Sequence, residues 1–189
     1  MFYPPFGTVT FAFEGGNYVF PLAPIDPVEH TRDSAAGIAQ NFAWRLTGPK
    51  AGVLNPDATN ATHWYGITIP VRFQIYRDDT KAPQQLPPDG TKLAFTLKPL
   101  SKRIDGGDAQ PMTVERPYRA AAPADALNDL PPANYEVAGT ATLPDGSTKR
   151  LLLRIVSDAG PYTPAAKIVL IPYANTGEIV VLSLGWVME

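Results

Sequence analysis

The sequence contains no cysteine among its 189 residues. It can therefore form neither a disulfide framework nor a thiolate zinc site, and it has no cysteine nucleophile. Histidine is nearly absent as well, because only His30 and His63 occur. A three-ligand metal site would need both histidines and a carboxylate. The two lie in separate loop-like segments, so the pattern favours ordinary surface histidines over metal ligands.

Long apolar runs are also missing. No segment approaches the roughly 20 apolar residues of a membrane-spanning helix. The first residues have neither the basic stretch nor the apolar core of a signal peptide. We therefore expect no membrane contact. We also expect the protein to be made in a cytoplasm, which is that of the host cell if the chain belongs to a virus.

Charge of one sign is not in excess. Lys and Arg total 16 against 18 Asp and Glu, a formal net charge of -2. Proteins that bind nucleic acid normally carry a basic surplus that neutralises phosphates, so we expect no direct nucleic-acid contact. A local basic patch around Lys98, Lys102 and Arg103 is the alternative. Solvated charges beside a strand explain these three residues more simply.

No catalytic centre is recognisable. The chain lacks the G-x-S-x-G turn that exposes a nucleophilic serine. Residues 30–34 combine acid, base and hydroxyl groups, but the members of a triad come from separate elements. Asp105 and Asp108 could give two oxygens to Ca²⁺, yet the further acids of a calcium loop are missing, so a turn is favoured. The sequence predicts a protein that is not an enzyme and has no cofactor or metal.

Proline is abundant instead. There are 21 prolines and 15 glycines, and average proline usage is only about 5%. They are scattered between short apolar runs, where they separate strands, and they form no low-complexity tract. This distribution of proline and glycine predicts many short strands joined by proline-rich loops.

The clearest element is a hairpin over residues 8–22. Val9, Phe11 and Phe13 alternate with small or polar residues, as in a half-buried strand. Gly15-Gly16 suits a two-residue type I′ turn, which needs positive φ at both positions. The expected partners are Glu14 with Asn17, Phe13 with Tyr18, Phe11 with Phe20 and Val9 with Leu22. All three apolar pairs then share one face.

Further strands follow along the chain. Residues 64–76 alternate strictly, with Pro70 indicating an edge or a bulge. A further alternating strand contains Leu93, Phe95 and Leu97 and is stopped by Pro99. Residues 112–118 form a short strand, and residues 135–156 form a hairpin turning at 144–147. The apolar residues that alternate along this hairpin are Tyr135, Val137, Ala141 and Leu143 on its first strand and Leu151, Leu153 and Ile155 on its second. The apolar runs in 168–173 and 178–187 suggest central strands covered on both faces. Residues 26–36 predict a short helix after Asp26, 41–46 a strand, and 120–130 a loop with one helical turn at most.

These elements predict one domain over residues 1–189, with 1–7 as an extended arm. The fold class is all-β: a single antiparallel β-sandwich or jelly roll of about nine or ten strands, with long proline-rich loops and at most one short helix. No internal repeat or change of composition divides the chain.

Two aromatic groups are candidate contact residues. Trp44, Trp64-Tyr65 and Trp186 could line a sugar platform, although aromatics at strand positions usually belong to the core. Trp64 is opposite in phase to Tyr65, so one of the two should face outward or into an interface. The second group is an apolar, proline-stiffened arm that either docks on a neighbouring subunit or folds onto its own domain: Phe2, Tyr3, Pro4, Pro5 and Phe6.

The cysteine-free, proline-rich, all-β character resembles that of bacteriophage virion structural proteins of the jelly-roll or β-sandwich type. The resemblance concerns the whole chain and rests on no motif, so it assigns no residue a role. It implies an oligomeric capsid, cement or decoration, or tail component, located in the virion, whose partners are other copies of itself or other virion proteins. Residues 134–137 and 144–146 also resemble the strands and turns of immunoglobulin-like sandwiches. The alternative is therefore a non-catalytic ligand- or carbohydrate-binding β-sandwich module.

Overall fold

The fold is known from a computed structural model, which describes residues 7–24, 42–43, 45–50, 53–57, 60, 63–74, 85–119, 124–157, 160–172, 179–181 and 183–189. Within these ranges the structure is all-β, and no helix has the length and apolarity to cross a membrane. The predicted helix at 26–36 and residues 1–6 of the predicted arm lie outside the described residues. The described strands are β1 Thr8–Phe13, β2 Gly16–Pro21, β3 Ala23–Pro24, β4 Phe42–Ala43, β5 Ile67–Phe73, β6 Lys92–Pro99, β7 Met112–Pro117, β8 Ala124–Leu130, β9 Tyr135–Thr142, β10 Thr148–Ile155, β11 Ala165–Ile168, β12 Ile171–Pro172, β13 Ile179–Val180 and β14 Leu184–Met188.

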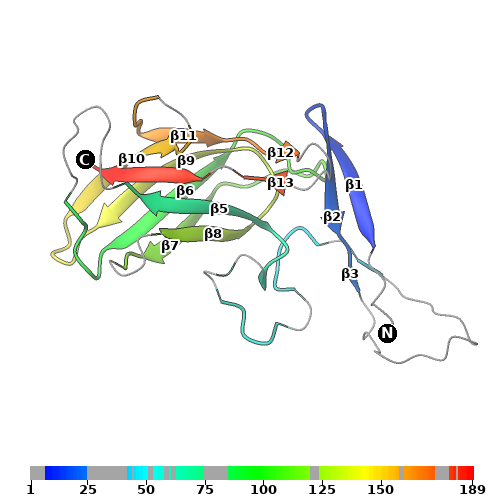
Figure 1. The fold of residues 1–189 in the computed structure, drawn as a ribbon, viewed down its shortest axis with the longest axis horizontal. Helices are drawn as coiled ribbons and strands as arrows, with labels where there is room; N and C mark the ends of the chain where they lie inside the picture. Colours follow the sequence, from blue (N-terminus) through cyan, green and yellow to red (C-terminus); the bar gives the residue numbers. More distant parts are fainter. Residues whose placement is uncertain are drawn as a thin grey trace, which may run out of the picture.

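One eight-stranded sheet forms the body of the protein (Figure 1). Its strands lie in the order β7-β6-β9-β10-β14-β5-β8, and β11 pairs with the first half of β9. The prediction of a purely antiparallel sheet is wrong at one place, because β14 runs parallel to β5. Turn residues encode pairing between strands that are neighbours in sequence. The pairing of the last strand with β5 is long-range, and no turn specifies it.

The two edges of this sheet approach each other. The guanidinium of Arg116 on β7 donates from Nε to the carbonyl oxygen of Ala126 on β8, at 3.1 Å. Because β7 and β8 are the first and last strands of the sheet, the sheet must curl to allow this contact.

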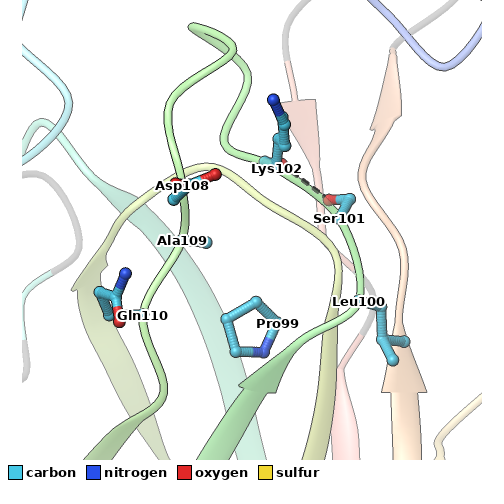
Figure 2. Close-up of a pocket in the computed structure, with 7 residues that line it drawn as sticks. All are labelled: Pro99, Leu100, Ser101, Lys102, Asp108, Ala109 and Gln110. Carbon is cyan, nitrogen blue, oxygen red and sulfur yellow. Dashed lines mark hydrogen bonds between the residues drawn. The ribbon is translucent and has the colours of Figure 1, made fainter.

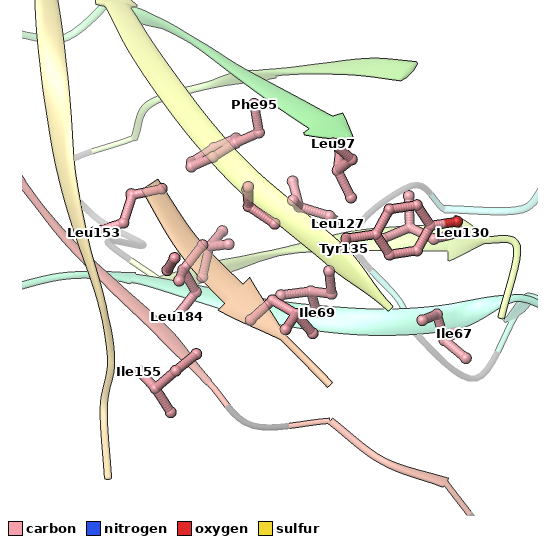
Figure 3. Close-up of a cluster of buried hydrophobic side chains, with 14 of the residues drawn as sticks. Ile67, Ile69, Phe95, Leu97, Leu127, Leu130, Tyr135, Leu153, Ile155 and Leu184 are labelled. Carbon is pink, nitrogen blue, oxygen red and sulfur yellow. The ribbon is translucent and has the colours of Figure 1, made fainter. Parts of the chain in front are cut away.

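The inner face of the curled sheet holds the hydrophobic core. Along β5, Ile67, Ile69, Val71 and Phe73 are buried, as the alternation predicts. The predicted apolar residues of β6 are buried as well, and so are those of the β9–β10 hairpin except Leu143, which is half-buried. Figure 3 shows several of them converging with Leu127, Leu130 and Leu184. At one end of the core, Trp186 packs edge-on against Phe73 and Tyr118, with ring centroids 4.9 and 5.9 Å apart.

The segment expected to be a loop at 120–130 contains strand β8. Its alternation is interrupted by a bulge, since Ile67 pairs with Leu130 but Ile69 pairs with Leu127. Two residues of β8 thus face one of β5, which hides the period of two from sequence analysis. Pro70 predicted either an edge strand or a bulge. A bulge is present, but it lies between Ile67 and Ile69 and not at Pro70 itself. β5 is not an edge strand, because it lies between β14 and β8.

The prediction that both apolar runs near the carboxyl end are covered on both faces is wrong for the run at 168–171, and the run at 179–182 is described only in part. The covered strand of the second segment is β14, whose Trp186 and Val187 are buried on opposite faces. In contrast, Val169 and Ile171 are 50% and 40% exposed. The run at 168–171 therefore presents alternate apolar side chains to solvent.

The hairpin β1–β2 forms, but with a different register from the expected one. The turn is Glu14-Gly15, with φ of 45° and 83°, and Phe13 faces Gly16, Phe11 faces Tyr18 and Val9 faces Phe20. The shift moves each predicted partner by two positions, so the apolar residues still share one face. Gly15 has a positive φ in either turn, and the hydrogen bond of Glu14 to Asn134, outside the hairpin, favours the observed one.

Candidate interaction surface at the end of the sheet

Asn134, in the loop between β8 and β9, is a buried polar residue that makes four hydrogen bonds. It is only 6% exposed, and its side chain accepts a hydrogen bond from the backbone N–H of Leu170 at 2.9 Å. Its amide nitrogen donates to the carboxylate of Glu14 at the hairpin turn. Its backbone N–H donates to Ser101 Oγ at 3.0 Å, and its carbonyl accepts from Leu100 N at 2.9 Å.

These bonds join four chain segments at one point. A buried polar group without partners would cost about 1–3 kcal/mol, and here both side-chain atoms of Asn134 are used. The hairpin turn, the loop after β6 and the segment after β11 are therefore held in fixed positions around Asn134.

A second bond fixes the hairpin from its other strand. The hydroxyl of Tyr18 donates to the carbonyl oxygen of Leu170, at 3.0 Å and out of contact with solvent. Burial raises the pKa of Tyr18, and the negative charge of Glu14 raises it further. In Figure 1 the hairpin stands across the end of the main sheet, with β2 on the inner side next to β12 and β1 on the outer side.

Large apolar side chains surround this junction on the outside. Leu100 is 45% exposed, and Val169 and Ile171 are similarly open. Leu100 and Leu170 are both bonded to Asn134, so Leu100 and Val169 flank the same loop. Figure 2 shows Leu100 beside the orange segment that follows β11. Apolar side chains that gather on a surface mark sites of contact with other molecules.

An open pocket of about 510 Å³ lies on the other side of Leu100 (Figure 2). It lies between the segment that follows β6 and the segment that leads into β7. Lys102 and Asp108 supply a charge of each sign at its rim. The pocket can therefore take a polar side chain or a small polar group, and nothing in its lining forms a nucleophile–base pair.

The predicted turn at Asp105-Gly106-Gly107-Asp108 is confirmed, and its carboxylate is occupied by protein groups. Arg103 donates to both oxygens of Asp105, at 3.0 and 2.9 Å, and Gly107 N donates to Asp105 Oδ1 at 3.1 Å. Burial alone would raise the pKa of Asp105, but these hydrogen bonds outweigh it and hold the pKa below its usual value. Of the basic patch considered from sequence, Arg103 is thus engaged in an ion pair.

Trp64 is half-buried, as is Tyr65. The indole nitrogen of Trp64 donates to the carbonyl of Asp57 at 2.9 Å. The neighbouring His63 accepts at Nδ1 from Asp57 N–H at 3.0 Å, and its Nε2 lies 3.0 Å from the Asn60 side chain. His63 thereby serves to order its loop.

The remaining candidates fall into two groups. Trp186 belongs to the core, being 1% exposed, and so cannot line a sugar platform. Trp44, His30 and the arm with Phe2, Tyr3, Pro4, Pro5 and Phe6 lie outside the described residues. Among the described residues, no three His, Cys, Asp or Glu side chains are grouped so that they could hold a metal ion.

Sequence analysis did not identify Asn134 or its partner Glu14. Asn134 follows two prolines and an alanine, which indicates only a loop before a strand. The partner is far away in the sequence, and no local pattern connects the two.

We compared the chain with known proteins. No protein-family model, no curated protein and no solved structure matches it.

Proposed function

We propose that this chain is a structural protein of a virus particle, a capsid, cement or tail component that acts through subunit contacts. The observation that carries the proposal is the surface around Asn134. There, buried hydrogen bonds fix a two-stranded hairpin across the end of the sheet, and Leu100, Val169 and Ile171 stay exposed beside it. A rigid projection with apolar neighbours suits a contact between subunits, because little conformational entropy is lost on binding.

The fold supports this role as a rigid building block. We propose that β7-β6-β9 and β10-β14-β5-β8 form the two layers of a β-sandwich, joined through the β9–β10 hairpin and packed around the core of Figure 3. The parallel β14–β5 pair is an addition to the antiparallel scheme of such sandwiches. A jelly-roll connectivity stays a prediction.

The test of this function is the mass of the purified full-length protein in solution. Light scattering over a concentration series should show a closed oligomer or growth into larger assemblies, which electron microscopy would then image. A monomer at every concentration would contradict a self-assembling subunit. Binding to a purified virus capsid would then be the remaining support for a cement protein.

A deletion variant tests whether the predicted arm contributes to subunit contacts. A chain without residues 1–6 should keep its far-ultraviolet circular dichroism and melting temperature but associate more weakly. If the deletion instead lowers the melting temperature and leaves association unchanged, the arm packs on its own domain and contributes no subunit contact.

A second candidate function is a carbohydrate- or ligand-binding module. The observation that favours it is Trp64, whose ring is held by its bond to Asp57 while part of its surface stays accessible. Aromatic faces of this kind stack on sugar rings. A glycan array probed with the wild-type protein and with Trp64→Ala distinguishes the two functions, because only a sugar-binding module loses a signal in the variant.

A further inference from the structure

The outer strand of the hairpin has a hydrogen-bonding edge with which no described strand pairs. Within the described part of the chain, β1 pairs only with β2. Leu22 N donates to Gly7 O at 2.9 Å, so Gly7 and Leu22 form a hydrogen-bonded pair. In an antiparallel ladder such pairs alternate with pairs that are not bonded. The N–H and C=O groups of Thr8, Thr10 and Ala12 therefore point away from β2.

This edge lacks the features with which proteins prevent strand addition. Exposed edges usually carry a lysine, a proline or a bulge, or they are very short. β1 has six residues, Thr-Val-Thr-Phe-Ala-Phe, with no charge and no proline, and its register with β2 is regular throughout. The turn between β1 and β2 is held by the hydrogen bond between Glu14 and Asn134, so β1 is fixed relative to the main sheet.

We propose that β1 of a second copy of this chain pairs antiparallel with this edge and forms a four-stranded sheet β2-β1-β1-β2 across a two-fold axis. The proposal rests on the proposed function in subunit contacts and names the surface that makes one of them. It commits to a second copy because the edge is complementary to itself.

The self-complementarity follows from the position of the outward groups. Thr10 is the middle one of the three residues whose backbone groups point outward. A two-fold axis at Thr10 therefore pairs Thr10 with Thr10 of the other copy, and Thr8 with Ala12. Val9 then faces Phe11, and all the odd-numbered apolar residues stay on one face of the joined sheet. No like charges meet, since the strand has none. Val9 and Phe13, half-buried in the single chain, gain neighbours from the second copy.

Two variants of Thr10 test this pairing. Thr10→Pro removes the outward N–H at the centre of the interface, while the bonds inside the hairpin belong to residues 9 and 11. Thr10 is exposed, and edge strands tolerate proline, so the fold should survive. Light scattering should show that the dissociation constant rises at least ten-fold. Circular dichroism and the melting temperature serve as the control for folding.

The second variant, Thr10→Cys, reports geometry directly, because the chain has no other cysteine. Residues paired across an antiparallel ladder have Cα atoms about 5.5 Å apart, within the range of a disulfide. Mild oxidation should therefore link two Thr10→Cys chains. The matched control is Asn17→Cys, which is exposed on β2 of the same hairpin. Its counterpart would lie about 20 Å away, because three strand spacings of about 4.8 Å combine with an offset of four residues at about 3.3 Å each.

The outcomes separate the pairing from the wider function. Loss of association in Thr10→Pro together with selective crosslinking of Thr10→Cys supports the pairing. Association that Thr10→Pro leaves unchanged overturns it and leaves the role in subunit contacts intact. Loss of association without crosslinking shows that the edge receives another strand, which also overturns it. A wild-type protein that is monomeric at all concentrations overturns both the pairing and self-assembly.

Discussion

The side-chain amide of Asn134 donates a hydrogen bond to the carboxylate of Glu14, 120 residues away in the sequence. Glu14 adopts a φ of 45°, a conformation that glycine and asparagine tolerate better than glutamate. The bond to Asn134 offsets this cost. One residue pair thus determines both where the hairpin turns and where the hairpin sits on the sheet.

Replacing Asn134 should loosen this junction. Asn134→Ala removes the acceptor of Leu170 N and the donor to Glu14, and leaves a buried N–H without its partner. We expect a loss of about 1–3 kcal/mol in the free energy of unfolding, measured by urea denaturation. Ser101→Ala is the control on the same network, because it removes only one bond to the Asn134 backbone. Equal, negligible effects of both variants would show that the network does not stabilise the fold.

The turn residue gives a test in which two effects compete. Glu14→Asn relieves the positive φ, worth about 1 kcal/mol, but removes a charge-assisted bond worth about 1.5–3 kcal/mol. The single variant should therefore be less stable than the wild type. In the Asn134→Ala background the bond is already lost, so the same substitution should increase stability. A double-mutant cycle by chemical denaturation measures the coupling, and additive effects would contradict this account.

The predicted strands show what short-range patterns can specify. The alternation in β5 and β6 and the turn at 144–147 correctly indicated strands and buried faces, because burial imposes a period of two on the sequence. The face of the first hairpin was predicted correctly for the same reason. Its register was not, because Gly15 can sit at either central position of a two-residue turn and the choice of Glu14-Gly15 depends on the bond of Glu14 to Asn134.

Long-range contacts explain what sequence analysis missed. The bulge at Asn128-Asp129 breaks the alternation of β8, and the parallel pairing of β14 with β5 depends on packing between distant segments. The candidate surface is of the same kind. Leu100, Val169 and Asn134 come from three separate segments, and only the folded sheet brings them together.

The bulge on β8 leaves little room for a side chain at Gly66. Asp129 adopts a φ of 61° and accepts hydrogen bonds from Gly48 N at 2.7 Å and Gly66 N at 3.2 Å. A Cβ atom on Gly66 would lie 2.7 Å from Asp129 Cα, which is a backbone clash. We expect Gly66→Ala to cost about 1–3 kcal/mol of unfolding free energy. Gly160→Ala, with nothing within 4 Å, should change stability by no more than about 0.5 kcal/mol. Thermal or urea unfolding measures the stability of the two variants. Similar unfolding free energies for Gly66→Ala and Gly160→Ala would contradict the clash.

Tyr135 should make stability depend on alkaline pH. Its ring is fully buried, its hydroxyl donates to Pro131 O at 2.6 Å, and burial raises its pKa to about 12, against a small opposing effect of Arg103. The unfolded chain loses this proton near pH 10, whereas the folded chain retains it. The stabilisation is therefore fully present below pH 10 and is lost as the pH rises toward 12.

A shift of about two pH units corresponds to roughly 2–3 kcal/mol. Because other tyrosines and lysines also titrate in this range, the informative quantity is the difference in unfolding free energy between wild type and Tyr135→Phe. Phenylalanine keeps the ring and has no proton to lose, so the advantage of the wild type should shrink between pH 10 and 12. A difference that stays constant from pH 8 to 12 would show that the Tyr135 hydroxyl titrates as it does in water, despite its buried position at the start of β9.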